Sequence, residues 1–141
     1  MRGAIRSNLE VLKAIPLFKA CSNKELAAVD SLVAEDRASA GEVIVREGRP
    51  GREAFIVLSG EAAVTASGVT VGRLGVGDFF GEMALLGDCP ERVATVTAIT
   101  PMRLLVIDPR QFASLLEMEG VAREMLKEVA DRLGAVLPRS A

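Results

Sequence analysis

The sequence predicts a single α+β domain built on a β jelly roll, a double-stranded β-helix-like sandwich, flanked by N-terminal and C-terminal helices. Three observations predict this architecture. The 141 residues suit one domain that buries a sizeable core. Between about 41 and 108, short β-branched stretches alternate with turn residues at near-regular spacing. Helix-start signals stand on both sides of this region, so we place N-terminal helices at about 8–35 and C-terminal helices at about 109–136.

The N-terminal helical part has a clear start signal. Ser22 to Glu25 form a capping box, in which the serine caps the helix and the glutamate reaches back to it. A shorter helix over about 8–15 precedes it and ends at Pro16. The longer helix carries an apolar stripe at helical spacing, which consists of Leu26, Val29, Leu32 and Val33. This stripe predicts that the helix packs against the rest of the domain.

The central region is divided by turn signals, which are Gly48 to Gly51, Ser59-Gly60, Ser67-Gly68 and Gly75 to Asp78. The pair Ser67-Gly68 separates residues 61–66 from 69–74, both of which read as strands. This spacing predicts a hairpin with a two-residue turn.

The C-terminal part begins at Asp108-Pro109, a helix cap followed by a first-turn proline. We expect Gly120 to separate this helix from a last one over about 121–136. That helix carries an apolar side made of Val121, Met125, Val129, Leu133 and Val136. The residues after it, 137–141, are too few for a DNA-reading helix-turn-helix, which argues against a transcription factor within this chain.

Composition excludes several function classes. The net charge of −2 lacks the basic footprint of nucleic-acid binding. No apolar run approaches a membrane span and no signal-peptide core is present, so we expect a cytoplasmic domain without a membrane segment. Cys21 and Cys89 make no disulfide framework. The chain has no histidine, the commonest metal ligand and general base, so we expect neither a metal site nor catalysis.

The most informative segment runs from Gly77 to Thr97, GDFFGEMALLGDCPERVATVT. Gly81 and Glu82 stand before a short apolar helical turn, whose first N–H groups could bind a phosphate. Arg92 can close on the same anion with its planar fork of donors. A carboxylate repels phosphate unless it faces a hydroxyl group, so Glu82 indicates a ligand with both groups. That ligand is a ribose phosphate.

The same segment resembles the phosphate-binding cassette of cyclic nucleotide-binding domains, which occur in bacterial regulators, kinase regulatory subunits and gated channels. The cassette pattern G-D-x-F-G-E-x-A-L-L, a spacer and R-x-A-T-V is matched by Gly77, Asp78, Phe80, Gly81, Glu82, Ala84, Leu85, Leu86, Arg92, Ala94, Thr95 and Val96. Further matches are PLF at 16–18, REG at 46–48, the sheet-turn pattern at 55–60 and the lead-in at 74–78. The resemblance covers about 9–135.

This resemblance implies a cyclic nucleotide sensor that binds cyclic AMP, with cyclic GMP as the other candidate ligand, and that has no enzymatic activity. The ligand-binding residues it implies are Gly81, Glu82, Met83, Ala84, Arg92, Val93, Ala94, Val71, Leu74 and Arg132. Leu85 or Leu86 would repack on binding, and the helix over 121–136 would close as a lid over the base. The alternative is a degenerate domain that keeps the fold for contacts with protein partners. The effector or partner protein is open in either case.

Several of these residues have a second interpretation. Arg92 could be an ordinary loop arginine, but it begins an apolar strand, where a half-buried charge needs a partner. Phe79 and Phe80 could stack on a base, although core packing is the better interpretation in a chain with so few aromatic residues. Arg132 is equally a lid residue stacking on the base or a solvated helix residue.

The wall of the base pocket is expected to be aliphatic, formed by Val64, Val71, Leu74 and Met83. Val93 stands where family members that hydrogen-bond a guanine carry a hydroxyl residue. Because valine has no hydroxyl, we expect a preference for cyclic AMP.

Overall fold

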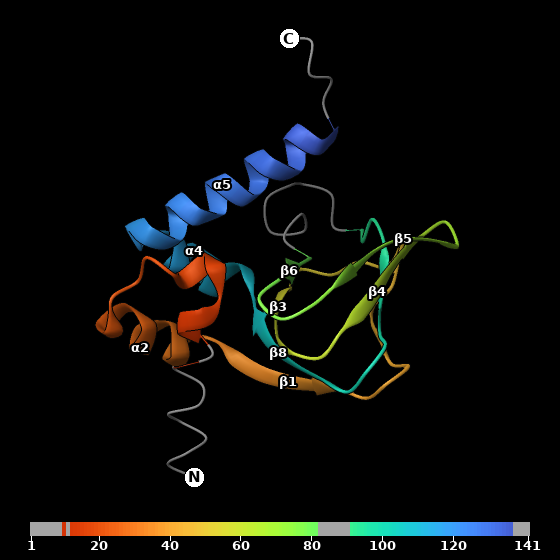
Figure 1. Ribbon diagram of the computed structural model, residues 1–141, viewed down its shortest axis with the longest axis horizontal. Coiled ribbons are helices and arrows are strands. Elements are labelled where there is room, and N and C mark those ends of the chain that lie inside the picture. The colour runs from red at the N-terminus through yellow and green to blue at the C-terminus, as the bar shows by residue number, and fades with distance from the viewer. Residues whose placement is uncertain (1–9, 11, 82–90, 137–141) are drawn as a thin grey trace.

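The computed structural model describes residues 10, 12–81 and 91–136, and of residues 128, 129 and 132–136 it describes the backbone (Figure 1). The elements are η1 (Pro16–Phe18), α2 (Asn23–Leu32), β1 (Ala34–Ala38), β2 (Val43–Val45), β3 (Ala54–Ser59), β4 (Ala62–Ala66), β5 (Val69–Leu74), β6 (Phe79–Phe80), β7 (Thr95–Ala98), β8 (Met102–Ile107), α4 (Pro109–Leu116) and α5 (Glu119–Val136). Residues 10 and 12–14 are also helical, in agreement with the short helix predicted before Pro16.

Within the described residues, the strands form two four-stranded antiparallel sheets. Their orders are β1-β8-β3-β6 and β2-β7-β4-β5. Each sheet combines strands that are far apart in the sequence, so neither could form from consecutive hairpins alone. The predicted jelly-roll sandwich is confirmed.

Strand β3 is covered on both faces, which explains why its side chains are almost all buried. Ile56 and Leu58 belong to a hydrophobic cluster shared with the helices. Phe55 and Val57 belong to a second cluster, between the two sheets. Successive side chains of a strand point to opposite faces, so one strand serves both clusters. Figure 1 shows α2, α4 and α5 gathered beside the strands, where they cover the outer face of the β3–β8 sheet.

Both helix-start signals adopt the predicted geometry. The Ser22 hydroxyl accepts from Glu25 N at 3.2 Å, and Glu25 Oε1 accepts from Ser22 N at 2.9 Å. Asp108 caps α4 with Pro109 in the first turn, and Gln111 closes a second capping box that the sequence analysis did not single out. The Ser67-Gly68 turn is also confirmed, with φ of 52° and 79°, the two positive values that a tight hairpin turn favours.

The N-terminal boundary differs from the prediction. Helix α2 ends at Leu32 and β1 begins at Ala34, whereas the sequence analysis extended the helices to about 35 and began the strands at about 41. The sequence of β1, AEDRA, is polar, and four of its five residues are exposed on the edge of the sheet. A strand without an apolar face produces no period-2 signal.

The predicted break at Gly120 is wrong. Gly120 lies in the first turn of α5, and the interruption falls between α4 and α5, at 117–118. The physical reason for a glycine here is close packing. A Cβ atom on Gly120 would lie 3.2 Å from the Cβ of Ala20, so the helix approaches the segment after η1 closely.

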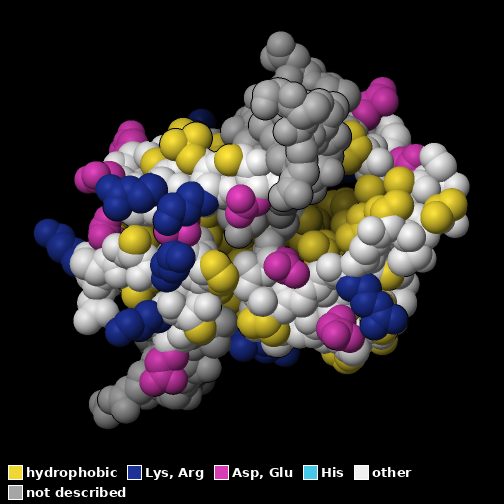
Figure 2. Space-filling view, turned by 45° about the horizontal axis from the view of Figure 1, so that its top comes forward, with side chains coloured by type: hydrophobic (Ala, Val, Ile, Leu, Met, Phe, Trp, Pro, Cys, Tyr) yellow, Lys and Arg dark blue, Asp and Glu magenta, His cyan; other side chains and the backbone are white. Residues whose placement is uncertain are grey.

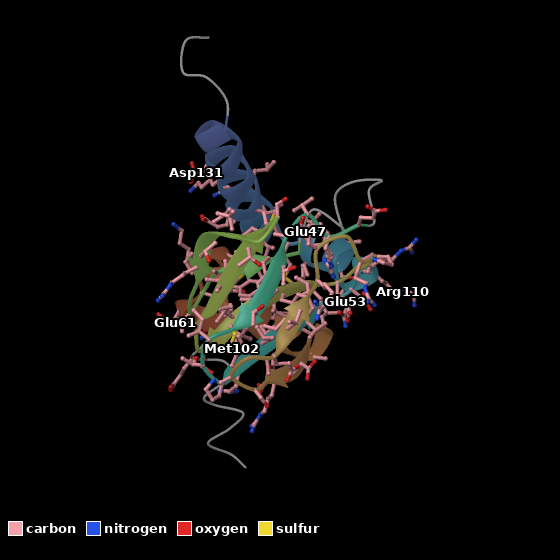
Figure 3. All side chains as sticks on the ribbon, turned by 90° about the vertical axis from the view of Figure 1, so that its right-hand side faces the viewer. Glu47, Glu53, Glu61, Met102, Arg110 and Asp131 are labelled. Carbon is pink, nitrogen blue, oxygen red and sulfur yellow. The ribbon has the colours of Figure 1, made fainter. Side chains whose placement is uncertain are left out.

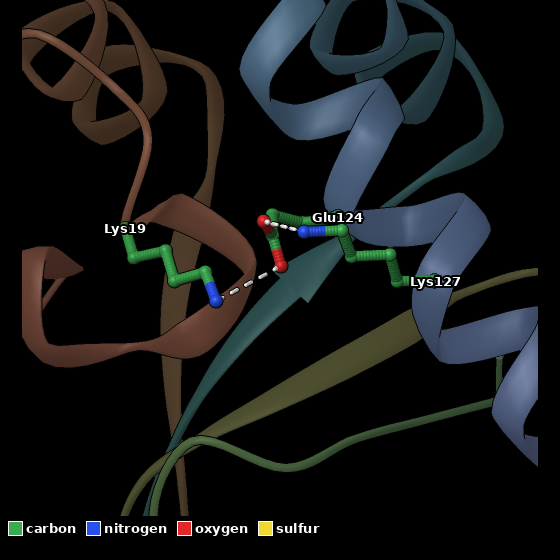
Figure 4. Close-up of polar contacts among 3 residues, drawn as sticks. All are labelled: Lys19, Glu124 and Lys127. Carbon is green, nitrogen blue, oxygen red and sulfur yellow. Dashed lines mark hydrogen bonds and ion pairs between the residues drawn. The ribbon is translucent and has the colours of Figure 1, made fainter.

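A buried carboxylate also joins α5 to this N-terminal segment (Figure 4). Glu124 is 6% exposed and accepts from Lys127 Nζ at 3.3 Å, and its other carboxylate oxygen lies 3.6 Å from Lys19 Nζ. Both lysine side chains are largely exposed, so water still reaches the charges. Glu124 therefore links the first half of α5 to Lys19, directly after η1.

The edge strand β1 is held to β8 by a bidentate ion pair. Arg103 Nε and Nη2 donate to the two oxygens of Glu35 at 2.9 and 2.7 Å. These hydrogen bonds lower the pKa of Glu35, against a smaller opposing effect of burial. A carboxyl with a lowered folded pKa stabilises the fold above its unfolded pKa of about 4.3, and this contribution is lost as the pH falls through the folded pKa.

We therefore expect Glu35→Gln to lower the free energy of unfolding by about 0.2–1 kcal/mol at pH 7, because the pair is partly exposed. The difference from the wild type should shrink toward pH 3, as the wild-type carboxyl takes up its proton. Urea unfolding at both pH values measures it. Glu61→Gln is the control, since the Glu61 side chain makes no ion pair within the described residues. An equal difference at both pH values would contradict the assignment.

Candidate functional site

A pocket of about 360 Å³ opens on the sandwich between β5, β6 and the segment that leads into β7. Its walls are mainly apolar, and Figure 2 shows a hollow with a band of hydrophobic side chains. The lining residues are Val45, Val64, Val71, Gly72, Arg73, Leu74, Phe79, Phe80, Gly81, Glu91, Arg92, Val93, Ala94 and Val96. An apolar hollow with a few polar groups at its rim is the usual form of a small-molecule site.

The structure brings together six of the residues predicted from the sequence. Val71, Leu74, Gly81, Arg92, Val93 and Ala94 all line this pocket, as does the expected wall residue Val64. Glu82, Met83, Ala84, Leu85 and Leu86 lie outside the described residues. Arg132 belongs to α5, but its side chain also lies outside the description.

Arg92 is held at the rim by backbone carbonyl groups. Its Nη2 donates to Glu53 O at 2.9 Å and its Nη1 donates to Gly81 O at 3.3 Å. These two bonds use two of the five N–H donors of a guanidinium. Partial burial lowers the pKa of Arg92, with a smaller opposing effect of Glu53, but a guanidinium stays protonated in proteins. Carbonyl groups orient this charge without neutralising it.

Among the described residues, no carboxylate forms an ion pair with Arg92. A half-buried cation beside an apolar wall is therefore available to an anion that enters the pocket. Charge-assisted hydrogen bonds from arginine to phosphate or carboxylate are among the stronger polar contacts in proteins.

Gly81 is required by its backbone conformation and by its surroundings. Its φ is +82°, and a Cβ atom there would lie 2.8 Å from Glu53 O and 2.9 Å from Arg92 Nη1. Glycine adopts this conformation without strain and leaves the room that the arginine needs. The cassette glycine and the cassette arginine thus meet directly.

The apolar walls have two levels of exposure. Val71 is 62% exposed and Val93 is 68% exposed, so both stand at the mouth of the pocket with apolar surface facing water. Phe79 and Phe80 lie deeper, at 5% and 6% exposure, and the Phe80 ring stacks on Phe55 with centroids 5.0 Å apart. The expected core role of the two cassette phenylalanines is confirmed.

The sequence analysis missed the partners that hold Arg92. Glu53 contributes its backbone carbonyl, and the loop between β2 and β3 pairs with the chain before β7 through Arg92 N to Arg49 O and Gly48 N to Arg92 O. Figure 3 marks Glu47 and Glu53 at the two ends of this loop. A carbonyl acceptor has no residue-type signature, and the turn at 48–51 was the only signal available.

No group of histidine, cysteine, aspartate or glutamate side chains in the described part of the chain could hold a metal ion. None of the described helices has both the length and the apolar character that a membrane crossing requires.

Comparison with known proteins identifies the family. The family model for the cyclic nucleotide-binding domain matches residues 35–119. The chain belongs to the cyclic nucleotide-binding domain family. This domain is a regulatory, ligand-binding fold type, and the resemblance read from the cassette is confirmed at the level of the family.

Relatives of three kinds share this domain. The chain is 38% identical over 108 residues to a cAMP-dependent protein kinase regulatory subunit of Eremothecium gossypii, covering 76% of this chain and 23% of the relative. It is 33% identical over 106 residues to the cGMP-dependent protein kinase egl-4 of Caenorhabditis briggsae, covering 75% of this chain and 14% of the relative. The structure of the Thermus thermophilus catabolite activator protein is similar at a TM-score of 0.78 and 28% identity, covering 86% of this chain and 59% of that one. The chain thus spans less than a quarter of these two curated relatives.

Proposed function

We propose that this chain is a cyclic nucleotide sensor that prefers cyclic AMP and signals by moving its C-terminal helix. The observation that carries the proposal is Arg92, an oriented cation that forms no ion pair with a described carboxylate, at the rim of an apolar pocket. A cyclic nucleotide presents one negative charge on its ribose phosphate and a flat base with apolar faces, and this combination matches that pocket.

We assign the described pocket residues to three tasks, which are binding of the phosphate, close approach of the backbone and contact with the base. Arg92 holds the phosphate, and the carbonyls of Gly81 and Glu53 keep its guanidinium in place. Ala94 lets the backbone approach the ligand closely. Val71 and Leu74 contact the base, and Val93, without a hydroxyl group, favours adenine over guanine.

Glu82, Met83 and Ala84 lie outside the described residues, and for them we propose what the family resemblance implies. Glu82 accepts a hydrogen bond from the ribose 2′-hydroxyl, and the backbone N–H groups at the start of the 82–86 turn bind the phosphate. Hydrogen bonds to charged groups contribute about 1.5–3 kcal/mol each. Two or three of them, with an apolar base contact, agree with a micromolar dissociation constant, which corresponds to about −8 kcal/mol.

The proposed output is closure of α5 over the base. Glu124 and Gly120 hold the first half of α5 against the N-terminal segment. Figure 3 marks Asp131 farther along α5, above the strands. The second half of the helix would close, with Arg132 either stacked on the base or solvated. A ligand moves the helix only if it binds the closed state more tightly. Identical amide chemical shifts along α5 with and without cyclic AMP would contradict the closure.

Calorimetric titration of the nucleotide-free domain tests the proposal, first with cyclic AMP and then with cyclic GMP. We expect saturable one-to-one binding that favours cyclic AMP. Tighter cyclic GMP binding would contradict the role given to Val93 but keep the phosphate site. No heat with either ligand at high micromolar concentration would favour the degenerate, protein-binding alternative.

We expect Glu82→Ala to weaken cyclic AMP binding less than loss of Arg92 does, and to remove discrimination against 2′-deoxy cyclic AMP, because the hydroxyl group then has no acceptor. The comparison of the two ligands by calorimetry measures this directly. Glu91→Ala is the matched control, since Glu91 is a carboxylate that lines the described pocket. If Glu91→Ala removes the discrimination and Glu82→Ala keeps it, Glu82 is not the hydroxyl partner.

A further inference from the structure

Gly51 lies directly against the guanidinium of Arg92. A Cβ atom built on Gly51 would lie 2.5 Å from Arg92 Nη2 and 2.7 Å from Arg92 Cζ, and it would also overlap Nε. Real Cβ atoms do not approach other atoms this closely, so a side chain at position 51 and the observed position of Arg92 exclude each other. No other described glycine has three atoms of one side chain this close to its added Cβ atom.

The backbone of Gly51 does not itself require glycine. Gly41, Gly48, Gly60, Gly68, Gly77 and Gly81 have positive φ, whereas Gly51 does not. An alanine at position 51 would therefore not have to adopt the left-handed conformation that strains other residues. The three atoms nearest to the added Cβ all belong to Arg92, so the closest obstacle to a side chain at this position is the guanidinium.

The loop and the backbone of Arg92 cannot easily separate to make room. Arg92 N donates to Arg49 O at 2.9 Å, Gly48 N donates to Arg92 O at 2.8 Å, and Pro50 forms an isolated β-bridge with Glu91. Two residues after Gly51, the Glu53 carbonyl accepts from Arg92 Nη2. The loop is thus paired with the arginine backbone on one side of Gly51 and bonded to its guanidinium on the other.

We infer that Gly51 is a positioning residue for Arg92. Because Gly51 has no side chain, the guanidinium of Arg92 can occupy the space beside its Cα atom. The inference about position stands on the geometry of the loop. Its consequence for ligand binding rests on the proposed function, in which Arg92 holds the phosphate.

A side chain at position 51 should displace the arginine without unfolding the domain. The overlapping atoms are the end of a flexible side chain and not backbone, so the strain is relieved when Arg92 rotates away. The displaced guanidinium then loses its bonds to Glu53 O and Gly81 O, and it no longer faces the pocket in the same orientation. Because charge-assisted hydrogen bonds depend on distance and angle, a displaced guanidinium should bind an anion in the pocket less tightly.

The first experiment needs no ligand. Nitrogen-15 NMR of the arginine side chains, with the Arg92 Nε–Hε signal assigned by its loss in Arg92→Ala, should show that signal shifted in Gly51→Ala. Gly75→Ala is the matched control, because Gly75 has no positive φ and a Cβ atom there would meet nothing within 4 Å. An unshifted Arg92 signal in Gly51→Ala overturns the inference.

The second experiment is a double-mutant cycle. Gly51→Ala should weaken cyclic AMP binding at least about tenfold in the wild type and by less than about twofold in the Arg92→Ala background, where the overlapping guanidinium is absent. An equal loss in both backgrounds would overturn the positioning role.

Thermal unfolding completes the same cycle and does not depend on binding. Any loss of melting temperature caused by Gly51→Ala should disappear in the Arg92→Ala background, even if Gly51→Ala alone folds poorly. Persistence of that loss in the double variant would overturn the inference. If the wild type binds no cyclic nucleotide, the NMR and melting results still decide the position of Arg92, while the proposed function fails separately.

Discussion

Arg92→Ala is expected to weaken cyclic AMP binding by about 2–5 kcal/mol and to leave the fold intact. Truncation of one partner of a desolvated charge pair has this range of cost, because the other charge stays buried without its counterion. Arg92 is half-buried at the rim of an apolar pocket, so water replaces the lost guanidinium poorly there.

The fold should survive because the two bonds that the Arg92 side chain donates go to carbonyl groups beside an open pocket, and the backbone bonds of Arg92 remain in the alanine variant. Water that enters the space of the removed side chain can satisfy both carbonyls, which limits the cost to stability. Circular dichroism and thermal unfolding check this part, and calorimetry with cyclic AMP measures the binding.

Arg110→Ala is the matched control, since Arg110 is an exposed arginine on α4 that does not line the pocket. It should bind cyclic AMP as the wild type does. If Arg92→Ala binds within about threefold of the wild type, a difference below about 1 kcal/mol, the phosphate of the ligand does not depend on this residue. The assignment of the pocket would then need a different anion-binding group.

Local signals in the sequence predicted local structure well. The capping box at Ser22, the start of α4 at Asp108 and the hairpin turn at Ser67-Gly68 each depend on a few adjacent residues, and all three have the expected geometry. The jelly roll itself was predicted from the spacing of turns, and its strand order follows from pairings between distant segments that no local pattern encodes.

The elements that the sequence did not reveal depend on tertiary contacts. Strand β1 is polar and exposed, so only its pairing with β8 makes it a strand. Gly120 resembles a helix break, but it is a packing glycine against Ala20. In both cases, the residue types permit several structures and the neighbouring element selects one.

The candidate site likewise contains residues that the sequence predicted and contacts that only the structure shows. Side chains that face the pocket, such as Val71, Leu74 and Arg92, were found from the cassette and from strand patterns. The groups that hold Arg92 in place are a carbonyl of Glu53, a carbonyl of Gly81 and the bare Cα of Gly51. Glu53, Gly81 and Gly51 make these contacts through their backbone atoms. Because no side chain takes part on their side, residue types alone could not predict the contacts.

Phe18→Ala should cause the largest loss of stability among the substitutions considered, about 3–5 kcal/mol in the free energy of unfolding. Phe18 is fully buried in the cluster that joins the helices to the β3–β8 sheet, together with Ile56, Leu115 and Val121. Removal of the ring loses its transfer free energy and leaves a cavity that the surrounding strands cannot close.

Urea unfolding at pH 7 measures this loss, and Phe18→Leu is the graded control, because a leucine refills much of the volume and should cost distinctly less. Domains of this size are stable by about 5–15 kcal/mol, so the alanine variant should remain partly folded at low temperature. A loss below about 1 kcal/mol would mean that η1 is not packed against the sheet and α5 in solution. Since α5 is held to the same segment by Ala20 and Lys19, such a result would also remove the anchor from which the second half of α5 is proposed to move.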